Sequence, residues 1–317
     1  MNRVARHHHY VPQAYLRAFT ENGAKKSKFT VYDLRTGARF ETTPRNVAGE
    51  RDFNRISVPG YAPDAIETEM AKFERLVPNA VRRIEETNQF QDEEKIIILN
   101  LIALLAVRHP DRREYMRTFH AKLANIVMGM TLHSKVRFEG IISQMRVQGG
   151  SVENDISYEE LKEFYERGEY TIEVATERHL SIENTMHEAL LPLLIARKWM
   201  LYRADPAVGH FITCDSPVSL TWKKPEKAPP LYSSPGFGML DTEIVFPLTK
   251  GLVLVGNFDG VSGYQVAQDL LIAIVNARIA TQSRRQIYSP KRHFLAVDSD
   301  LNIINGEEYF SDRDKKA

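Results

Sequence analysis

The chain has 317 residues, of which 43% are hydrophobic and 26% are charged, and its net charge is +1. This composition predicts a globular protein with a sizeable core. The chain as a whole lacks the large excess of basic residues that marks many nucleic-acid-binding proteins. One cysteine, Cys214, excludes an internal disulfide and a thiolate metal cluster. The start lacks an apolar signal segment and the most apolar run, residues 96–107, is too short to span a bilayer, so we expect a cytoplasmic protein without membrane spans.

Three histidines precede the first predicted helix, residues 12–19. Because Pro12 suits the first helical position, the histidines should lie in extended chain. Gln13 and Arg17 are four residues apart, so they share a polar helix face beside His8 and His9. A helix start next to these groups could hold an anion such as a phosphate. The same histidines could instead dock an N-terminal arm, and both interpretations stay open.

A hairpin and three helices should follow. Residues 29–33 and 38–42 alternate as strands do and flank the turn at Gly37. Apolar residues recur at helical spacing over residues 64–88, where Pro78 should kink or split the helix. The next helix is buried and ends at Arg108, whose charge requires an anionic partner. That partner is either a carboxylate of this chain or a ligand phosphate.

The central part is predicted to be helical up to residue 197. Residues 118–148 are weakly helical, and Gly149 begins a break. Ser157 and Glu160 form the sequence pattern of a capping box, and the helix that they open should stop at Gly168. A longer helix, residues 174–197, carries one stripe of possible metal ligands, His179, Glu183 and His187. His179 and His187 are about 12 Å apart along the helix axis, which is too far for one ion to reach both imidazoles. A solvated face is therefore favoured over a metal site.

The last third should supply a sheet and one helix. The predicted strands are residues 199–202, 210–213, 218–222, 243–247 and 252–256, with edge strands at 286–288 and 293–297 and a helix over 264–284. The fold class is therefore α+β, with a helical N-terminal and central part packed on a mostly antiparallel or mixed C-terminal sheet, and an N-terminal β-hairpin. We expect a single composite domain over residues 1–317. Its parts are an arm and hairpin at 1–60, helices at 61–197, the sheet with one helix at 198–305 and a mobile tail at 306–317.

A polar turn follows one of these strands. Asp215, Ser216 and Pro217 come directly after an apolar strand end, where side chains are held rigidly at the rim of a sheet. Asp215 could orient an imidazole or help to bind a metal. The same three residues also form a good turn without any further role. Cys214 would need a nearby histidine to act as a nucleophile.

Several segments resemble the bacterial domain-of-unknown-function family 4238. The resemblance covers nearly the whole chain and is most specific at residues 8–13, which read His-His-Tyr-Val-Pro-Gln, and at residues 213–217, which read Thr-Cys-Asp-Ser-Pro. It extends to the hairpin, to residues 44–53 and to the corner of Arg108 and Pro110. The chain departs from the family pattern at Asn54, where a tyrosine is expected, and at Cys214 and Ser216, which replace serine and asparagine. The resemblance implies no activity, because the family is named for its lack of one.

Three functions fit these observations. The first is a nuclease-like hydrolase of phosphodiester or nucleotide substrates, in which His8 and His9 are catalytic bases or ligands of a divalent metal and Asp215 supports them. The expected substrate-binding residues are Tyr10, Gln13, Arg17, Arg108, Thr213 and Asn276. The alternative is a non-catalytic module that binds a nucleotide or protein. The third is a purely structural arm, which burial of both imidazoles against backbone groups would favour. Nucleic acid or nucleotide is the expected partner, and the oligomeric state is not predicted.

Overall fold

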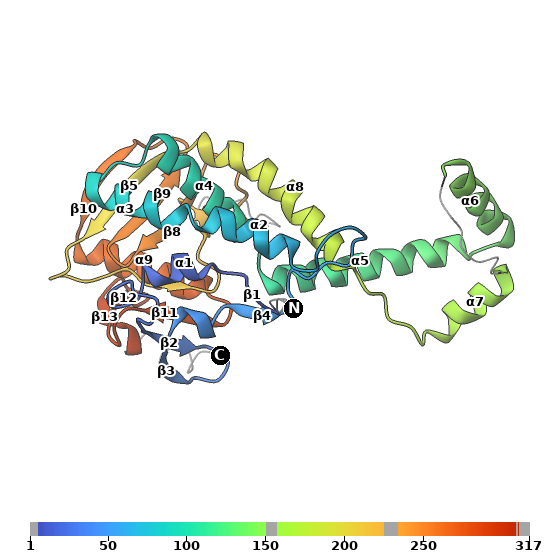
Figure 1. The fold of residues 1–317 in the computed structure, drawn as a ribbon, viewed down its shortest axis with the longest axis horizontal. Coiled ribbons are helices and arrows are strands. Elements are labelled where there is room, and N and C mark those ends of the chain that lie inside the picture. Colours follow the sequence, from blue (N-terminus) through green and yellow to red (C-terminus); the bar gives the residue numbers. More distant parts are fainter. Residues whose placement is uncertain (1–5, 150–156, 225–233, 309, 311–317) are drawn as a thin grey trace. The chain divides into compact units, whose positions relative to one another are not determined.

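The computed structural model describes residues 6–149, 157–224, 234–308 and 310 (Figure 1). The chain divides into two compact units, of which unit 1 holds residues 1–109 and 180–317 and unit 2 holds residues 110–179. Helices and mostly antiparallel or mixed sheets confirm the α+β class. The single composite domain stays a prediction.

The N-terminal histidines lie in extended chain, as predicted. Strand β1 (His7–His9) pairs antiparallel with β4 (Gly49–Arg51). A Cβ atom at Gly49 would lie 2.5 Å from Nε2 of His7, so a larger residue there would displace the exposed His7 ring. Pro12 has ψ of 132° and precedes helix α1 (Gln13–Arg17), which therefore begins one residue later than predicted.

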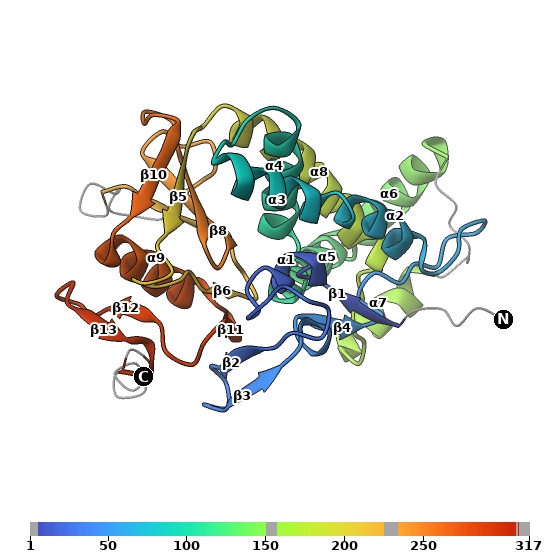
Figure 2. The same cartoon turned by 60° about the vertical axis from the view of Figure 1, so that its left-hand side comes forward.

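The predicted hairpin is present, and it belongs to a larger sheet. Strands β2 (Phe29–Asp33) and β3 (Arg39–Thr42) pair antiparallel. Strand β11 (Gln286–Ser289) pairs with β2 on one side and with β6 (Thr213–Cys214) on the other. Figure 2 shows this order of strands, β3-β2-β11-β6. The prediction that residues 286–288 form an edge strand is therefore wrong.

Three helices and a short 3-10 turn complete the N-terminal part. The 3-10 turn is η1 (Pro44–Asn46). The helical pattern splits just before Pro78 into α2 (Ala65–Glu74) and α3 (Val77–Thr87), as predicted. Helix α4 (Asp92–Val107) is apolar on all sides after its acidic first turn, so most of it is buried in the core.

A second sheet fills the rest of unit 1. Its strands, in spatial order, are β10 (Gly263–Ala267), β5 (Lys198–Ala204), β9 (Leu252–Asn257), β8 (Thr242–Thr249) and β7 (Ser219–Trp222). The sheet is mixed, since β10 runs parallel to β5 and the other pairs are antiparallel.

The chain after β10 differs from the prediction in two places. The helix predicted over residues 264–284 is wrong at its start, because β10 occupies the first residues and α9 (Asp269–Gln282) begins later. A small ladder of β12 (Leu295–Val297) and β13 (Ile303–Asn305) follows. In the part predicted as a mobile tail, residues 309 and 311–317 lie outside the described residues, while Phe310 is buried and stacks on Tyr32 at 5.0 Å.

Unit 2 is helical in the part that the structure describes. It contains α5 (Pro110–Thr131), α6 (Lys135–Val147) and α7 (Tyr158–Arg167). Ser157 and Glu160 form the predicted capping box, and Gly168 ends α7 with φ of 67°. The predicted break lies largely outside the description, at residues 150–156. Helix α8 (Thr176–Ile195) follows, and from Leu180 onward it belongs to unit 1.

One half-buried histidine should make the stability of unit 1 depend on pH. Burial, with a smaller effect of Lys291 and Lys250, lowers the pKa of His210 to about 4 from its usual 6.5. A lowered histidine pKa means that the unfolded state binds the proton more readily than the folded state. The contribution of His210 to the free energy of unfolding is therefore complete above pH 6.5 and is lost as the pH falls to 4. We expect His210→Gln to remove up to about 3 kcal/mol of this dependence.

The measurement is urea denaturation at pH 4 to 7.5, taken as the difference between variant and wild type. His293→Gln is the matched control, since His293 is exposed. An identical pH slope in wild type and His210→Gln would contradict the prediction.

Candidate functional site

His8 is fixed by the main chain. Its ring is 1% exposed, and Nδ1 accepts a hydrogen bond from the backbone N–H of Asn54 at 2.8 Å. A ring nitrogen that accepts carries no proton, so the ring is neutral with its proton on Nε2 while this bond is made. Oε1 of Glu67 lies 3.9 Å from the same nitrogen. His8 therefore anchors the loop that carries Asn54.

His9 is held in a similar way. Its Nε2 donates to the backbone oxygen of Arg45 at 3.1 Å, and Nδ1 is left to accept from the side-chain amide of Gln13 at 3.3 Å. Burial lowers the pKa of His9 below its usual value, and the bond to Arg45 opposes that effect. Gln13 thus orients His9. His8 matches the arrangement expected of a structural arm, whereas His9 matches it only in part, because its ring is half-buried and one of its bonds is to a side chain.

Arg108 has the anionic partner that the sequence required. Its side chain is 3% exposed, and Nη2 lies 3.5 Å from Oε1 of Glu67 on α2. The side-chain amide of Asn54 donates to the same carboxylate oxygen. The guanidinium also lies over the ring of Phe53, 5.7 Å from its centroid. The carboxylate alternative is therefore the one observed, and Glu67 joins the end of α4 to the N-terminal segment.

A second carboxylate of α2 is perturbed. Burial raises the pKa of Glu74 to about 7, Arg108 and Arg17 lower it, and Glu67 adds to the increase. Burial therefore favours the protonated, neutral form of Glu74 at a higher pH than is usual for a glutamate. The cluster of charged side chains around Arg108 therefore carries less negative charge than it would if every carboxyl group in it were ionised.

Asp215 is bound within its own turn. Its carboxylate accepts from the hydroxyl of Ser283 at 3.1 Å and from the backbone N–H groups of Arg284 and Arg285 at 3.0 and 2.7 Å. The residue is 1% exposed, and Nε2 of His109 lies 3.8 Å from Oδ2. The described contacts of Asp215 are thus with His109 and with the chain that follows α9. Those of His8 are with Asn54 and Glu67.

The other predicted binding residues lie in several places. The ring of Tyr10 packs edge-on against His109 at 5.3 Å. The hydroxyl of Thr213 bonds that of Tyr15 at 2.7 Å. Asn276 is fully buried, accepts from the backbone N–H of Ile212 and donates to the backbone oxygens of His210 and Leu295. Thr213 and Asn276 therefore bond groups of the fold. Arg17 lies close enough to Glu74 to lower its pKa.

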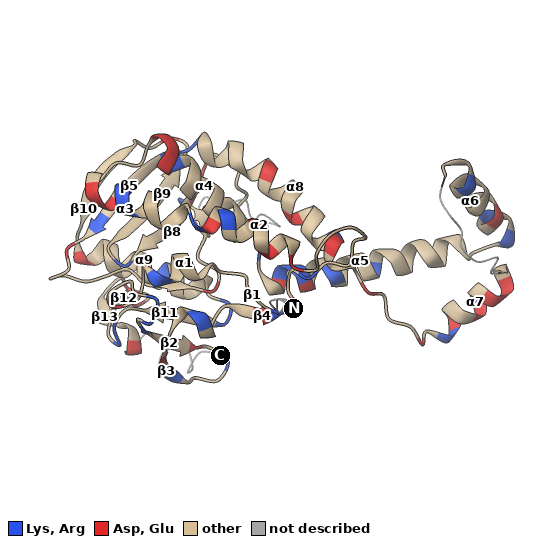
Figure 3. Cartoon of the chain, viewed as in Figure 1, with Lys and Arg blue, Asp and Glu red and all other residues tan. Residues whose placement is uncertain are grey.

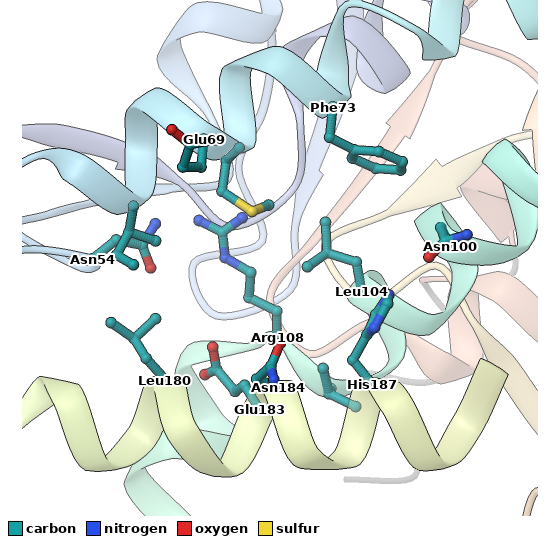
Figure 4. Close-up of a pocket in the computed structure, with 13 residues that line it drawn as sticks. Asn54, Glu69, Phe73, Asn100, Leu104, Arg108, Leu180, Glu183, Asn184 and His187 are labelled. Atoms are coloured by element: carbon teal, nitrogen blue, oxygen red, sulfur yellow. The ribbon is translucent and has the colours of Figure 1, made fainter.

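A pocket opens beside Arg108, between α2, the end of α4 and α8. Its volume is about 420 Å³, within the usual range for small ligands. Figure 4 shows Arg108 reaching from the end of α4 toward α2, with Glu183, Asn184 and His187 on α8. The lining residues are Asn54, Ile66, Glu69, Met70, Phe73, Asn100, Leu104, Val107, Arg108, Leu180, Glu183, Asn184 and His187. We call this cavity the α2–α4–α8 pocket.

The sequence interpretation missed most of this lining. Glu183 and His187 were expected on a solvated face, yet both line the pocket. Glu67 and Glu74, which lie near Arg108, were not singled out from the sequence. Their spacing of seven residues places both on one face of α2, which is a signal that could have found them beside Arg108.

The described residues contain neither a metal-binding cluster nor a helix that could span a membrane. They contain no group of three or more histidine, cysteine, aspartate or glutamate side chains arranged to hold a metal ion. Within the same residues, every helix is too short or too polar to cross a membrane.

Comparison with known proteins identifies a family. No curated protein and no solved structure shows significant similarity to the chain. One family profile, described as "Protein of unknown function (DUF4238)", matches residues 7–293. The match begins at the histidine segment and ends beyond β11, so it includes Arg108 and every predicted site residue. The chain belongs to the DUF4238 family.

Proposed function

We propose that the protein binds a small molecule of the nucleotide class in the α2–α4–α8 pocket. The observation that carries this proposal is a buried, permanently charged arginine, Arg108, in the wall of a pocket of about 420 Å³ that is otherwise largely apolar. An apolar cavity with a few fixed polar groups is the usual form of a small-molecule site.

The chemistry of the lining favours one ligand form. Phe73, Met70 and Leu180 offer apolar surface for a planar base, and Arg108 offers a planar guanidinium for a phosphate. The carboxylates of Glu69 and Glu183 can accept from ribose hydroxyls, but they disfavour a chain of phosphates. We therefore infer a nucleoside monophosphate rather than a triphosphate or a nucleic-acid strand.

In this proposal the N-terminal histidines support the site. His8 fixes the backbone of Asn54, whose side chain lines the pocket and bonds Glu67. Glu67 in turn faces Arg108. In this proposal the N-terminal histidine segment therefore positions the polar side of the pocket. This role corresponds to the non-catalytic binding module that was the alternative considered from the sequence.

A specific observation favours hydrolysis as a second candidate. Glu183 and His187 lie one turn apart on α8, and both line the pocket. A carboxylate beside an imidazole can orient it as a general base. Release of phosphate or base from a bound nucleotide, lost in His187→Ala, would favour this candidate over binding alone.

Calorimetric titration of the full chain tests the binding proposal. We expect nucleoside monophosphates to bind more tightly than the matching nucleosides and triphosphates. Leu180→Trp fills the pocket and should abolish binding, whereas Met186→Trp, an exposed position of the same helix, should leave it unchanged. Equal heats for Leu180→Trp and wild type, or no binding by any nucleotide, would contradict the proposal.

A further inference from the structure

Helix α5 of unit 2 carries an exposed apolar stripe. Its members are 45% to 72% exposed, and they are Tyr115, Phe119, Leu123, Ile126 and Met130. At 100° per residue these five positions fall within an arc of about 80° along a helix about 33 Å long. We call this set the α5 stripe. A stripe this narrow and continuous is typical of a helix that packs against a partner.

The contacts that α5 makes with the rest of unit 2 lie on its other side, where its residues remain largely exposed. The backbone oxygen of Asn125 accepts from the hydroxyl of Tyr165 on α7 at 3.3 Å, and its side-chain oxygen accepts from that of Tyr170 at 2.6 Å. Ala124 and Met128 lie on the same side and line a cavity with Leu161 of α7. The α5 stripe is therefore not the face that packs inside unit 2.

The spacing of the stripe matches a second copy of itself. Tyr115 and Met130 are equally far from the midpoint between Lys122 and Leu123, and so are Phe119 and Ile126. In a two-fold interface residue i of one copy meets residue j of the other, and j meets i. An antiparallel pair of α5 helices would place Tyr115 against Met130 and Phe119 against Ile126 at both ends, and Leu123 against Lys122 at the centre.

Charge favours the antiparallel direction. The first half of α5 carries four basic residues, Arg112, Arg113, Arg117 and Lys122, against two acidic ones, Asp111 and Glu114, whereas no charged residue occurs from Leu123 to Thr131. Figure 3 shows this second half without charged colours. Four basic and two acidic residues leave this half with a net positive charge, so a parallel pair would bring the two basic halves together, and like charges repel. An antiparallel pair places them against the uncharged half.

The area is sufficient for association. If a fully exposed side chain of this size presents about 200 Å², the stripe offers about 550 Å² per copy and about 1,100 Å² for the pair. A specific interface needs about 1,000 Å² in total. From the spacing, the charge distribution and this area, we infer that the protein forms an antiparallel two-fold dimer through the α5 stripe.

Light scattering after size exclusion measures the mass of the full chain. We expect about 73 kDa, twice the 36.3 kDa of one chain. Ile126→Glu should give a monomer, while Val136→Glu, at an 81% exposed position of α6, should stay dimeric. A monomeric wild type, or a folded Ile126→Glu protein that remains dimeric, would overturn the inference.

Oxidative cross-linking tests the direction with conservative changes. Leu123→Cys lies beside the two-fold axis and should form a disulfide between copies. Tyr115→Cys alone should not, because its two copies would be about 22 Å apart along the axis, beyond the reach of about 7 Å of a disulfide. Mixed Tyr115→Cys and Met130→Cys chains should cross-link. Native Cys214 is fully buried and does not interfere. Efficient self-linking of Tyr115→Cys would rule out the antiparallel pair.

Discussion

Asp215→Ala should lower the free energy of unfolding by about 3 to 5 kcal/mol. The carboxylate satisfies three donors, the Ser283 hydroxyl and the backbone N–H groups of Arg284 and Arg285, at a position that is 1% exposed. Its removal leaves the two backbone N–H groups, whose bonds are partly buried, without an acceptor at about 1 to 3 kcal/mol each, while the Ser283 hydroxyl keeps the backbone oxygen of Gln286. Urea denaturation followed by circular dichroism at pH 7 measures the change.

The control for this variant is Asp259→Ala. Asp259 is 62% exposed and pairs with Lys223 at 2.5 Å, so its loss should change stability far less than the loss of Asp215. A catalytic Asp215 would behave in the opposite way, because its loss would remove activity and spare stability. Equal stability of Asp215→Ala and wild type would therefore contradict the structural role.

Arg108→Gln should weaken the binding of a nucleoside monophosphate about 10- to 100-fold, the loss expected for a charged hydrogen bond of about 1.5 to 3 kcal/mol. The effect should be small for the matching nucleoside, which lacks the phosphate. Calorimetric titration of both ligands gives this difference directly.

Arg278→Gln is a matched control. Arg278 is a partly buried arginine that pairs with Glu243 at 2.7 Å, and it lies outside the pocket lining. Its loss should reduce stability and leave affinity unchanged. If both variants lost affinity equally, the loss would reflect general damage rather than a phosphate contact of Arg108.

Local signals in the sequence predicted much of the fold. The capping box of Ser157 and Glu160 gave the start of α7, and Gly168 gave its end. Pro78 placed the split between α2 and α3. These signals succeed because hydrogen bonds at a helix start, left-handed backbone and a missing N–H depend on a few adjacent residues.

Long-range pairing was not predictable in this way. Strand β10 was expected as helix because its apolar residues run into those of α9. It is a strand because β5, some 60 positions earlier, supplies its hydrogen bonds. The central place of β11 depends equally on partners far away in the chain, β2 and β6. Single-sequence periodicity contains no information on such partners.

The site was predictable only in part. The end of a buried helix required an anionic partner for Arg108, and Glu67 is that partner. The histidine segment was correctly singled out as extended chain beside Gln13. The pocket was not foreseen, since its walls come from α2, α4 and α8, and their spacing in the chain says nothing of their packing.

A crystal structure with a bound nucleoside monophosphate tests the central claim most directly. We predict the ligand in the α2–α4–α8 pocket, its base beside Phe73 and Leu180 and its phosphate within hydrogen-bond distance of the Arg108 guanidinium. A ligand bound away from this pocket, for example between the histidine segment and Asp215, would contradict the account.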